Sequence, residues 1–462
     1  MNSEDTFLRL SRFAHFVEEE HKCVAVFNTL NLGVVLVTPD IADILKRKKV
    51  LKEDDLSPEV FEKLRKQRIL IPDSRSELDD YYLVQQHLEH PRIKILYLLL
   101  TDACNLRCRY CYFENAIPIK YEFSKMSQEV AKRGIDLFEK IITRDTKEGD
   151  DSGEPQIVFY GGEPFYNWDT MEWALDYISG LLQEGKLLKE TSVSINTNGT
   201  LITREMGISL SKYPFVNVAL SVDGPENIHD IQRKDQVDRG TFSRVHQTIK
   251  MLQEMGIKVG ISCTLANHNV DQAEEILIWL HKTYGISSIG FNILIGTAEF
   301  NSGGGRDYAE KVSDKLISCF LIARERGIYE DRIMRKVRSF VNGNIYFHDC
   351  GGYGQQIVIS PDGQVGVCQA YCGSKKYFVP LTEDFDPQTH QYWIEWKSRS
   401  PLNMPQCLDC IALANCGGGC AYSADSKSGS IWAIDETFCV FSRKAITFLV
   451  KDLMRQMLSK GP

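Results

Sequence analysis

The stretch Cys104-Asn105-Leu106-Arg107-Cys108-Arg109-Tyr110-Cys111 places three cysteines within eight residues, directly after an apolar run over 93–100. A strand of that composition would deliver three thiolates into one short loop, which is the donor set of an iron–sulfur cluster with one iron left without a protein ligand. A bacterial ferredoxin run adds a fourth cysteine, whereas no cysteine follows Cys111 here until Cys263. Taken alone, the motif also fits a zinc knuckle or an incomplete redox motif.

The spacing of three and then two residues between these cysteines resembles the cysteine loop of the radical S-adenosylmethionine (SAM) superfamily. That resemblance implies that Cys104, Cys108 and Cys111 hold a [4Fe–4S] cluster and that SAM occupies its open iron. It further implies an electron donor such as flavodoxin or ferredoxin and cleavage of SAM to a 5′-deoxyadenosyl radical, so that the cofactor supplies the difficult chemistry.

Composition narrows the class of protein. The chain has 462 residues, which predicts more than one domain, and a net charge of −8, which argues against a nucleic-acid-binding surface. No run of 18 apolar residues occurs and the N-terminus is acidic, so we expect a cytoplasmic protein with no membrane partner. In a reducing compartment, the 14 cysteines are better explained as metal ligands than as disulfides.

From residue 91 to 300 strands and amphipathic helices alternate, which predicts an α/β fold with a parallel sheet. Short polar or glycine-rich segments follow each strand, at the face where parallel β/α barrels carry their active sites. The resemblance implies a partial (β/α)6 barrel of the TIM type. The predicted strands are Ile93–Thr101, Gln156–Tyr160, Ser192–Thr197, Val216–Val222, Lys258–Leu265 and Ser288–Ile295.

Three of these strand ends carry motifs similar to the SAM-binding motifs of the family. Gly161-Gly162-Glu163-Pro164 resembles the motif that meets the amino group of SAM, and Glu163 can accept a hydrogen bond from an ammonium group. Asn196 stands where the family has a polar strand end near the ribose or substrate, although an Asn-Gly turn explains this segment equally well.

The fourth strand ends in Ser221-Val222-Asp223-Gly224-Pro225, followed by His229, Asp230 and Arg233. By the same resemblance, Ser221 and Arg233 hold the carboxylate of SAM, for which a guanidinium is well suited. Tyr110, between two of the cysteine ligands, is a candidate to pack on the adenine, and a place in the core remains open for it.

A second group of cysteines lies near the C-terminus. Cys350, Gly363, Cys368, Cys407, Cys410, Cys416, Cys420 and Cys439 follow the spacing of SPASM domains, which carry auxiliary [4Fe–4S] clusters. The resemblance implies an outer cluster on Cys407, Cys410, Cys416 and Cys439, and an inner cluster on Cys350, Cys368 and Cys420. Cys372 is the local candidate for a fourth inner ligand. A zinc ribbon remains the alternative for Cys407–Cys420.

The expected organisation has four parts. Residues 1–90 form a small module of strands and helices that resembles the winged-helix leader-recognition element of peptide-modifying enzymes, although a plain structural appendage fits as well. Residues 91–300 form the barrel, 301–345 a helical bridge, and 346–462 the SPASM domain with a closing amphipathic helix.

The combination is similar to radical SAM/SPASM maturases of ribosomally made peptides. We therefore expect a precursor peptide with a leader as substrate and a thioether or carbon–carbon crosslink as product. An anaerobic sulfatase maturase, which makes formylglycine, is the first alternative, and Gln369 counts against it because an acidic residue is expected there. An electron-transfer protein with several clusters and a zinc-bound peptide-binding scaffold are the others. The sequence indicates no general base.

Overall fold

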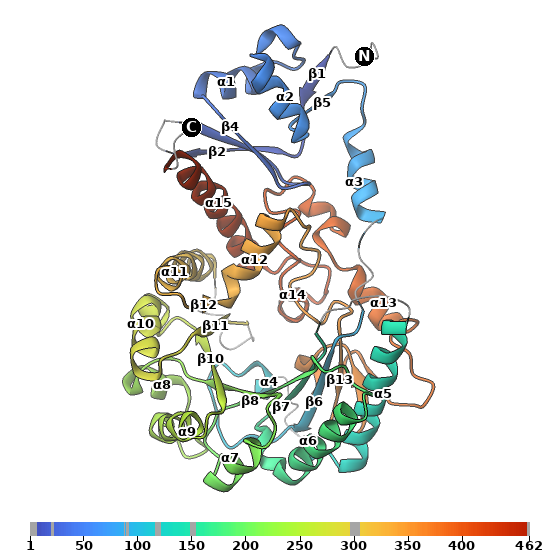
Figure 1. The fold of residues 1–462 in the computed structure, drawn as a ribbon, viewed down its shortest axis with the longest axis vertical. Helices are drawn as coiled ribbons and strands as arrows, with labels where there is room; N and C mark the ends of the chain where they lie inside the picture. Colours follow the sequence, from blue (N-terminus) through green and yellow to red (C-terminus); the bar gives the residue numbers. More distant parts are fainter. Residues whose placement is uncertain are drawn as a thin grey trace.

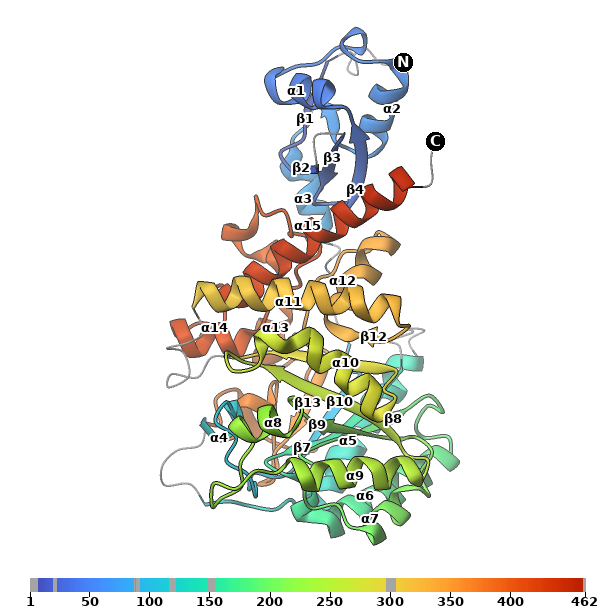
Figure 2. The same cartoon turned by 90° about the vertical axis from the view of Figure 1, so that its left-hand side faces the viewer.

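The computed structural model describes residues 7–19, 23–86, 88, 92–115, 122–147, 154–295 and 305–459. A ten-stranded sheet forms the centre of the larger body, and a small N-terminal module lies at one end of the molecule (Figures 1 and 2). The glycine run that begins at residue 303 lies outside the described residues except for Gly305, which precedes a helix.

Six parallel strands at the middle of the sheet confirm the predicted α/β fold. Adjacent strands follow one another in chain order, as expected for successive right-handed β/α units. Each begins and ends within two residues of its prediction. They are β6 (Ile95–Thr101), β7 (Gln156–Gly161), β8 (Ser192–Thr197), β9 (Val216–Ser221), β10 (Lys258–Leu265) and β11 (Ser288–Ile293).

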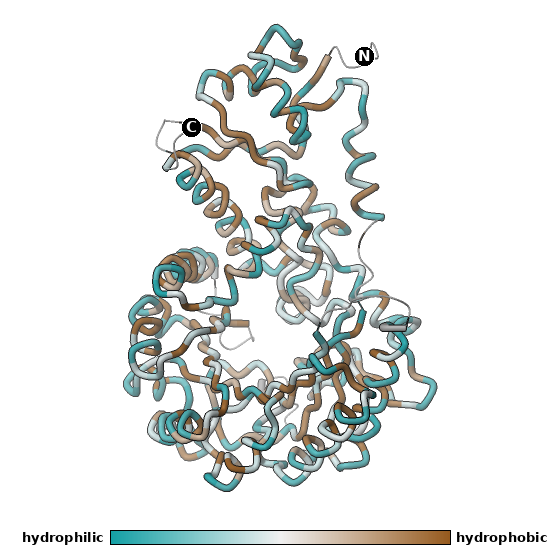
Figure 3. The backbone as a smooth tube through the Cα atoms, in the orientation of Figure 1, coloured by the Kyte–Doolittle hydropathy of each residue, from teal (hydrophilic) through white to brown (hydrophobic). Residues whose placement is uncertain are grey.

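Helices cover the outer face of this curved sheet (Figure 1). Their apolar sides pack on the strands, so hydrophobic residues concentrate in the strands while the helices alternate between hydrophobic and hydrophilic positions (Figure 3). The helices are α5 (Gln128–Lys147), α6 (Trp168–Gln183), α7 (Arg204–Leu210), α8 (Glu226–Gln232), α9 (Phe242–Glu254) and α10 (Ala273–Tyr284). The short helix α4 (Tyr112–Asn115), which follows Cys111 directly, lies on the inner side of the sheet instead (Figure 1).

The sheet continues beyond the six predicted strands. On one side, β12 (Tyr329–Glu330) pairs with β11. On the other side, β13 (Gln356–Ile359) pairs in parallel with β6, and β14 (Gln364–Gly366) and β15 (Phe378–Pro380) follow it in antiparallel pairs. The C-terminal cysteine-rich region is therefore joined to the barrel through the sheet itself, next to the strand that carries the Cys104 loop.

Long helices lie between the sheet and the N-terminal module (Figure 2). The closing helix α15 packs along α11, and its apolar residues contact both the barrel side and the N-terminal module. The helices of this part are α11 (Arg306–Glu325), α12 (Asp331–Asn342), α13 (Gln391–Ser398), α14 (Ala421–Ser428) and α15 (Glu436–Ser459).

The N-terminal module has its own hydrophobic core and a three-stranded antiparallel sheet in the order β2-β3-β4. The predicted hairpin and both predicted helices are present. Its elements are β1 (Leu8–Leu10), β2 (Ala14–Glu19), β3 (Cys23–Asn28), β4 (Gly33–Val37), α1 (Pro39–Arg47), α2 (Pro58–Lys66), β5 (Leu70–Pro72) and α3 (Glu77–Gln86).

This module is fixed to the C-terminal region by apolar and polar contacts. Phe27 is fully buried in a cluster with Ala412, Ala414 and residues of α15. The guanidinium of Arg12 donates to both carboxylate oxygens of Asp409, at 2.6 and 2.8 Å. The N-terminal sheet thus rests on the loop that carries Cys407, Cys410 and Cys416.

Within the described residues, no helix is long and apolar enough to cross a membrane.

We expect the Phe27→Ala variant to lower the free energy of unfolding by about 3 to 5 kcal/mol, the usual cost of removing a fully buried phenylalanine ring. Chemical denaturation followed by circular dichroism measures this. Val341→Ala is the control, because Val341 is 73% exposed and its truncation should change the free energy by less than about 0.5 kcal/mol. Equal effects of the two substitutions would contradict the docking described here.

Candidate active site

The Cys104–Cys111 loop begins three residues after β6, at the carboxyl face of the sheet. Burial raises the pKa of the Cys104 thiol, and the negative groups of Glu163, Cys108 and Cys111 raise it further. The three cysteines lie close enough to affect one another's pKa in a buried site. As thiolates they would repel one another unless a bound cation compensated their charges. The donor set therefore fits an iron–sulfur cluster, which would neutralise these charges.

Two glycines allow the backbone at the end of β7 to approach the backbone just before Cys104 closely. A Cβ atom added to Gly161, whose φ is +134°, would lie 2.1 Å from the carbonyl oxygen of Thr101, and one added to Gly162 would lie 2.2 Å from that of Ala103. The backbone N–H groups of Gly162 and Glu163 donate to those same two carbonyls, at 2.8 and 2.9 Å. The glycines are required for contact with the cysteine loop.

The side chain of Glu163 is fully buried behind this contact. Its carboxylate accepts hydrogen bonds from Thr197 Oγ1 at 2.7 Å, the N–H of Asn198 at 2.8 Å and the N–H of Phe165 at 3.1 Å. Burial raises the pKa of Glu163 to about 6, against the opposing effect of these hydrogen bonds. Three hydrogen bonds fix the orientation of this carboxylate, and burial makes its negative charge costly. A nearby ammonium group would offset that cost.

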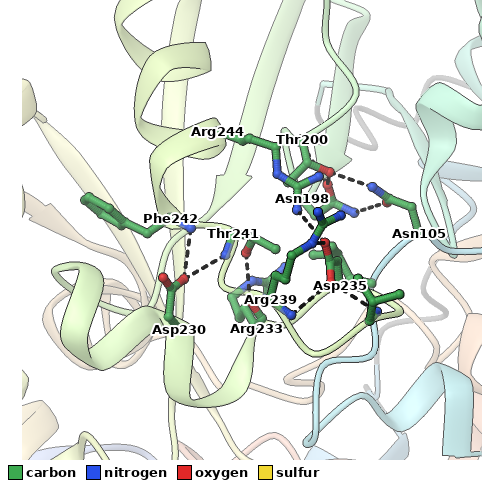
Figure 4. A network of polar contacts seen from close by, with 12 residues as sticks. Asn105, Asn198, Thr200, Asp230, Arg233, Asp235, Arg239, Thr241, Phe242 and Arg244 are labelled. Carbon is green, nitrogen blue, oxygen red and sulfur yellow. Dashed lines mark hydrogen bonds and ion pairs between the residues drawn. The ribbon is translucent and has the colours of Figure 1, made fainter.

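Asn198, which the sequence did not single out, has closer contact with the cysteine loop than the predicted Asn196. The Asn198 amide donates to Asn105 Oδ1 at 2.9 Å and to Cys104 Sγ at 3.8 Å, and its oxygen accepts from Thr200 (Figure 4). The side-chain oxygen of Asn196 instead accepts a hydrogen bond from Ser194 Oγ, at 3.3 Å. The Asn-Gly turn, which by itself explained this segment of the sequence, orients Asn198 toward the cysteine loop.

A segment after α8 holds the other side of the cysteine loop. The N–H groups of Arg107 and Arg109 donate to the carbonyls of Lys234 and Gln232, at 2.8 and 3.1 Å. Asp235 fixes this segment by accepting hydrogen bonds from the backbone and the side chain of Arg239, at 3.0 and 3.1 Å (Figure 4). The loop is thus held by the ends of β7 and β8 and by the chain that follows β9.

Arg233, predicted to bind the SAM carboxylate, is buried and donates to the hydroxyl of Tyr110 at 2.6 Å. Tyr110 in turn donates to Asp223 Oδ2 at 2.5 Å, so its hydroxyl lies between two polar side chains. The Nε of Arg233 is buried and has no hydrogen-bond partner among the described residues. A buried guanidinium with an unused donor, close to Cys108, fits an anionic group at this place.

Comparison with known proteins decides the family of this region. The family model of the radical SAM superfamily matches residues 98–280, which contain the cysteine loop, the Gly161–Glu163 contact and Arg233.

Residues 98–280 form a radical SAM domain.

Two curated radical SAM relatives match over most of the chain. The radical SAM cyclopropyl synthase TigE of Paramaledivibacter caminithermalis is 25% identical over 98% of this chain and 97% of its own. A cysteine-type anaerobic sulfatase-maturating enzyme of Clostridium perfringens is 26% identical over 74% of this chain and 92% of its own.

A solved structure with bound S-adenosylmethionine has the same fold. Streptococcus suis SuiB bound to S-adenosylmethionine superimposes with a TM-score of 0.55 and 16% identity, covering 95% of this chain and 99% of that one. This likeness extends over the N-terminal and C-terminal parts as well as the radical SAM domain.

Beside the radical SAM domain, the C-terminal cysteines form two groups whose members affect one another's pKa. Burial raises the pKa of Cys368, and Cys350 and Cys420 raise it further, which places these three close together. Burial likewise raises the pKa of Cys407, with further effects from Cys416, Cys410 and Cys439. These four cysteines line one pocket between α15 and the loop that follows η8 (Pro405–Cys407).

The proposed extra ligand, Cys372, has other neighbours. It is fully buried, and after burial the groups that affect its pKa are Lys375, Asp102 and Asp362. In the part of the chain that the structure describes, Cys350, Cys368 and Cys420 are not among the groups that shift the pKa of Cys372. Cys263 and Cys319 are fully buried in the main hydrophobic core.

Tyrosines connect the radical SAM site to the inner cysteine set. The hydroxyl oxygens of Tyr112 and Tyr160 lie 2.9 Å apart. Cys111 and Cys368 both contribute to raising the pKa of each tyrosine, after the larger effect of burial. The pairing of β13 with β6 brings these two regions together. The three-cysteine loop and the inner cysteines therefore face a common space at the carboxyl end of the sheet.

We expect Gly162→Ala to lower 5′-deoxyadenosine formation about 100-fold, because the added methyl group displaces the backbone before Cys104 and small misplacements at a catalytic centre have effects of that size. The measurement is 5′-deoxyadenosine after addition of SAM and dithionite without oxygen. Gly180→Ala in α6 is the matched control, since a Cβ atom there meets nothing within 4 Å. Equal rates in the two variants would contradict the role of the glycine contact.

The pKa of Glu163, about 6, predicts how SAM binding depends on pH. Below pH 6 the carboxyl group takes up a proton that the SAM ammonium must displace, so the dissociation constant of SAM should rise as pH falls, by up to about tenfold per unit. Above pH 6 this dependence should disappear. Anaerobic calorimetry between pH 5.5 and 7.5 measures it. Glu163→Gln should bind SAM more weakly at pH 7.5 and lose the slope, and an unchanged slope in that variant would refute the assignment.

Proposed function

We propose that the chain is a radical SAM peptide maturase that abstracts hydrogen from a ribosomally made precursor peptide and installs a crosslink, with two auxiliary [4Fe–4S] clusters in a C-terminal SPASM domain. The observation that carries the proposal is the match to TigE along 98% of this chain, which includes the N-terminal module and the C-terminal cysteines. The sulfatase-maturating relative covers only 74% of the chain.

The names of the relatives indicate the substrate and the bond. SuiB has been solved bound to a precursor peptide, SuiA, which supports a peptide substrate here. TigE is named a cyclopropyl synthase, and a cyclopropyl ring contains only carbon–carbon bonds. Of the two crosslinks expected from the sequence, the carbon–carbon bond is therefore favoured over the thioether.

Residues at the carboxyl face of the sheet would bind the cofactors. Cys104, Cys108 and Cys111 would hold the cluster, Glu163 would accept the SAM ammonium group, and Ser221 with Arg233 would meet its carboxylate. When bound, the cluster and SAM supply a 5′-deoxyadenosyl radical. The glycine contact and Asn198 keep the cysteine loop in place, and Tyr110 holds Arg233 in position from the side of Asp223.

The inner wall of the sheet suits a peptide. At alternate positions of β8 to β11, half-buried polar side chains face away from the helix-covered core, while the residues between them are apolar and buried. Such a wall offers hydrogen-bonding groups to the amides of a peptide backbone. The polar residues are Ser194, Asn196, Asn217, Ser221, Ser262, Thr264 and Asn292.

The N-terminal module would bind the leader of the precursor. Its sheet has two edge strands, β2 and β4, and an extended peptide can add to such an edge through main-chain hydrogen bonds. Because the module rests on the loop of Cys407 and Cys410, a leader bound there would lie on the side of the outer cysteine set.

The proposal predicts a mass loss of two hydrogens in a leader-bearing precursor peptide encoded beside this gene, when the reconstituted enzyme is given SAM and dithionite without oxygen. Tandem mass spectrometry locates the crosslink. A peptide with a sulfatase motif serves as the control substrate and should remain unmodified. Formylglycine in that control, with an unmodified precursor, would instead establish a sulfatase maturase.

A further inference from the structure

A fully buried arginine lies between the two sets of C-terminal cysteines. Arg399 follows α13 and its side chain has no exposed surface. Its charge acts on Cys420 of the inner set and on Cys407 of the outer set, where it lowers the pKa of each thiol against the larger effect of burial. No motif pointed to this residue in the sequence.

Every hydrogen bond of Arg399 goes to a neutral acceptor. Its guanidinium donates to the hydroxyl of Tyr353 and the carbonyl of Gly418, each at 2.6 Å, and to the carbonyl of Ala433 at 3.0 Å. A further hydrogen bond joins it to the carbonyl of Ile431. Among the described residues, no carboxylate lies within ion-pair distance of it. A buried cation without a countercharge is strongly unfavourable.

Asp435 is a buried acidic residue on which this charge acts. Its two carboxylate oxygens accept from the backbone N–H groups of Cys420 and Phe438, at 3.2 and 3.4 Å, and it forms no ion pair with Arg399 among the described residues. Asp435 therefore compensates the cation only in part, and Cys407 and Cys420 are further groups on which the cation acts. We infer that the remaining compensation comes from what the cysteines bind.

Arg399 also supports the turn that joins the two sets. The turn is Cys416-Gly417-Gly418-Gly419-Cys420, and its three glycines have φ values of +74°, +86° and +70°. A Cβ atom on Gly418 would lie 3.0 Å from a guanidinium nitrogen of Arg399. Tyr353, three residues after Cys350, donates to the carbonyl of Gly419 at 2.8 Å while it accepts from Arg399. The cation thus touches the one short segment that both cysteine sets share.

We propose that Arg399 is the shared countercharge of two auxiliary iron–sulfur clusters and raises the reduction potential of both. The inference rests on the proposed function, in which these cysteines hold clusters. A cluster ligated by thiolates is an anion and becomes more negative when reduced, so a fixed buried cation favours the reduced form. The same cation would adjust the two clusters together, because it lies between them.

The test uses the full chain with Cys104, Cys108 and Cys111 changed to Ala, so that only auxiliary clusters remain. Potentiometric titration followed by electron paramagnetic resonance gives their midpoints. Arg399→Met should shift both to more negative values, with at least a tenfold lower ratio of reduced to oxidised cluster at a fixed potential, which corresponds to 59 mV for one electron. Arg399→Lys, which keeps the charge, should restore most of the shift.

Two controls separate charge from packing. Tyr353→Phe removes a neutral hydrogen bond to Arg399 and leaves the charge, so the midpoints should stay close to those of the parent chain. In a chain with Cys104, Cys108 and Cys111 intact, Arg399→Met should leave the midpoint of the SAM-binding cluster unchanged. Auxiliary midpoints that do not move in Arg399→Met, with both clusters present, would overturn the proposal.

If the Arg399→Met variant does not retain its clusters, the free energy of unfolding of cluster-free protein provides the test. In cluster-free protein the substitution removes a buried charge that Asp435 compensates only in part, so its free energy of unfolding should equal or exceed that of the parent. A purely structural arginine would make the cluster-free variant less stable, and that result would refute the proposal. Absence of iron from the parent chain itself, with Arg399 intact, would instead refute the auxiliary clusters and hence the proposed function in its present form.

Discussion

The structure depends on the close backbone contact between the end of β7 and the chain that leads from β6 to Cys104. Two hydrogen bonds and two glycines bring these segments closer than any side chain would allow. This contact places the buried carboxylate of Glu163 behind the cysteine loop, where it also ties down the end of β8. The position of the three-cysteine loop and the position of the Glu163 carboxylate are therefore set by the same contact.

The C-terminal region depends on the same strand. Because β13 pairs with β6, the cysteines that flank β13 are brought to the side of the sheet where Cys111 lies. Cys350 and Cys368 contribute to raising the pKa of Tyr97 on β6, and Cys111 and Cys368 contribute to raising that of Tyr160 on β7. The N-terminal module completes the arrangement by holding the loop of the outer set through Arg12 and Thr29.

Much of this could be predicted from the sequence, because strong periodicity marks the six parallel strands and because cysteine spacing is a local property. β13 could not be predicted as a partner of β6, since a four-residue apolar strand carries no information about its neighbour. Asn198 was missed because its contact with Cys104 depends on how two distant strand ends meet.

Cys372 stays a predicted fourth ligand of the inner set. It lies four residues after Cys368 in the sequence, but the turn η6 (Gln369–Tyr371) intervenes, and the charges that reach it belong to Lys375, Asp102 and Asp362. Arg399 could not be singled out from the sequence, because an isolated arginine belongs to no motif. Its neutral hydrogen-bond acceptors and its effect on the neighbouring cysteines can be recognised only in the folded structure.

The measurement that tests the central claim most directly is anaerobic quantitation of iron and sulfide in the reconstituted chain, combined with SAM cleavage. The account predicts about twelve irons per chain, in three four-iron clusters. Changing Cys407, Cys410, Cys416 and Cys439 to Ala should remove about four of them, and changing Cys104, Cys108 and Cys111 should remove a different four together with all 5′-deoxyadenosine formation. Zinc in place of iron, in protein that leaves SAM intact, would contradict it.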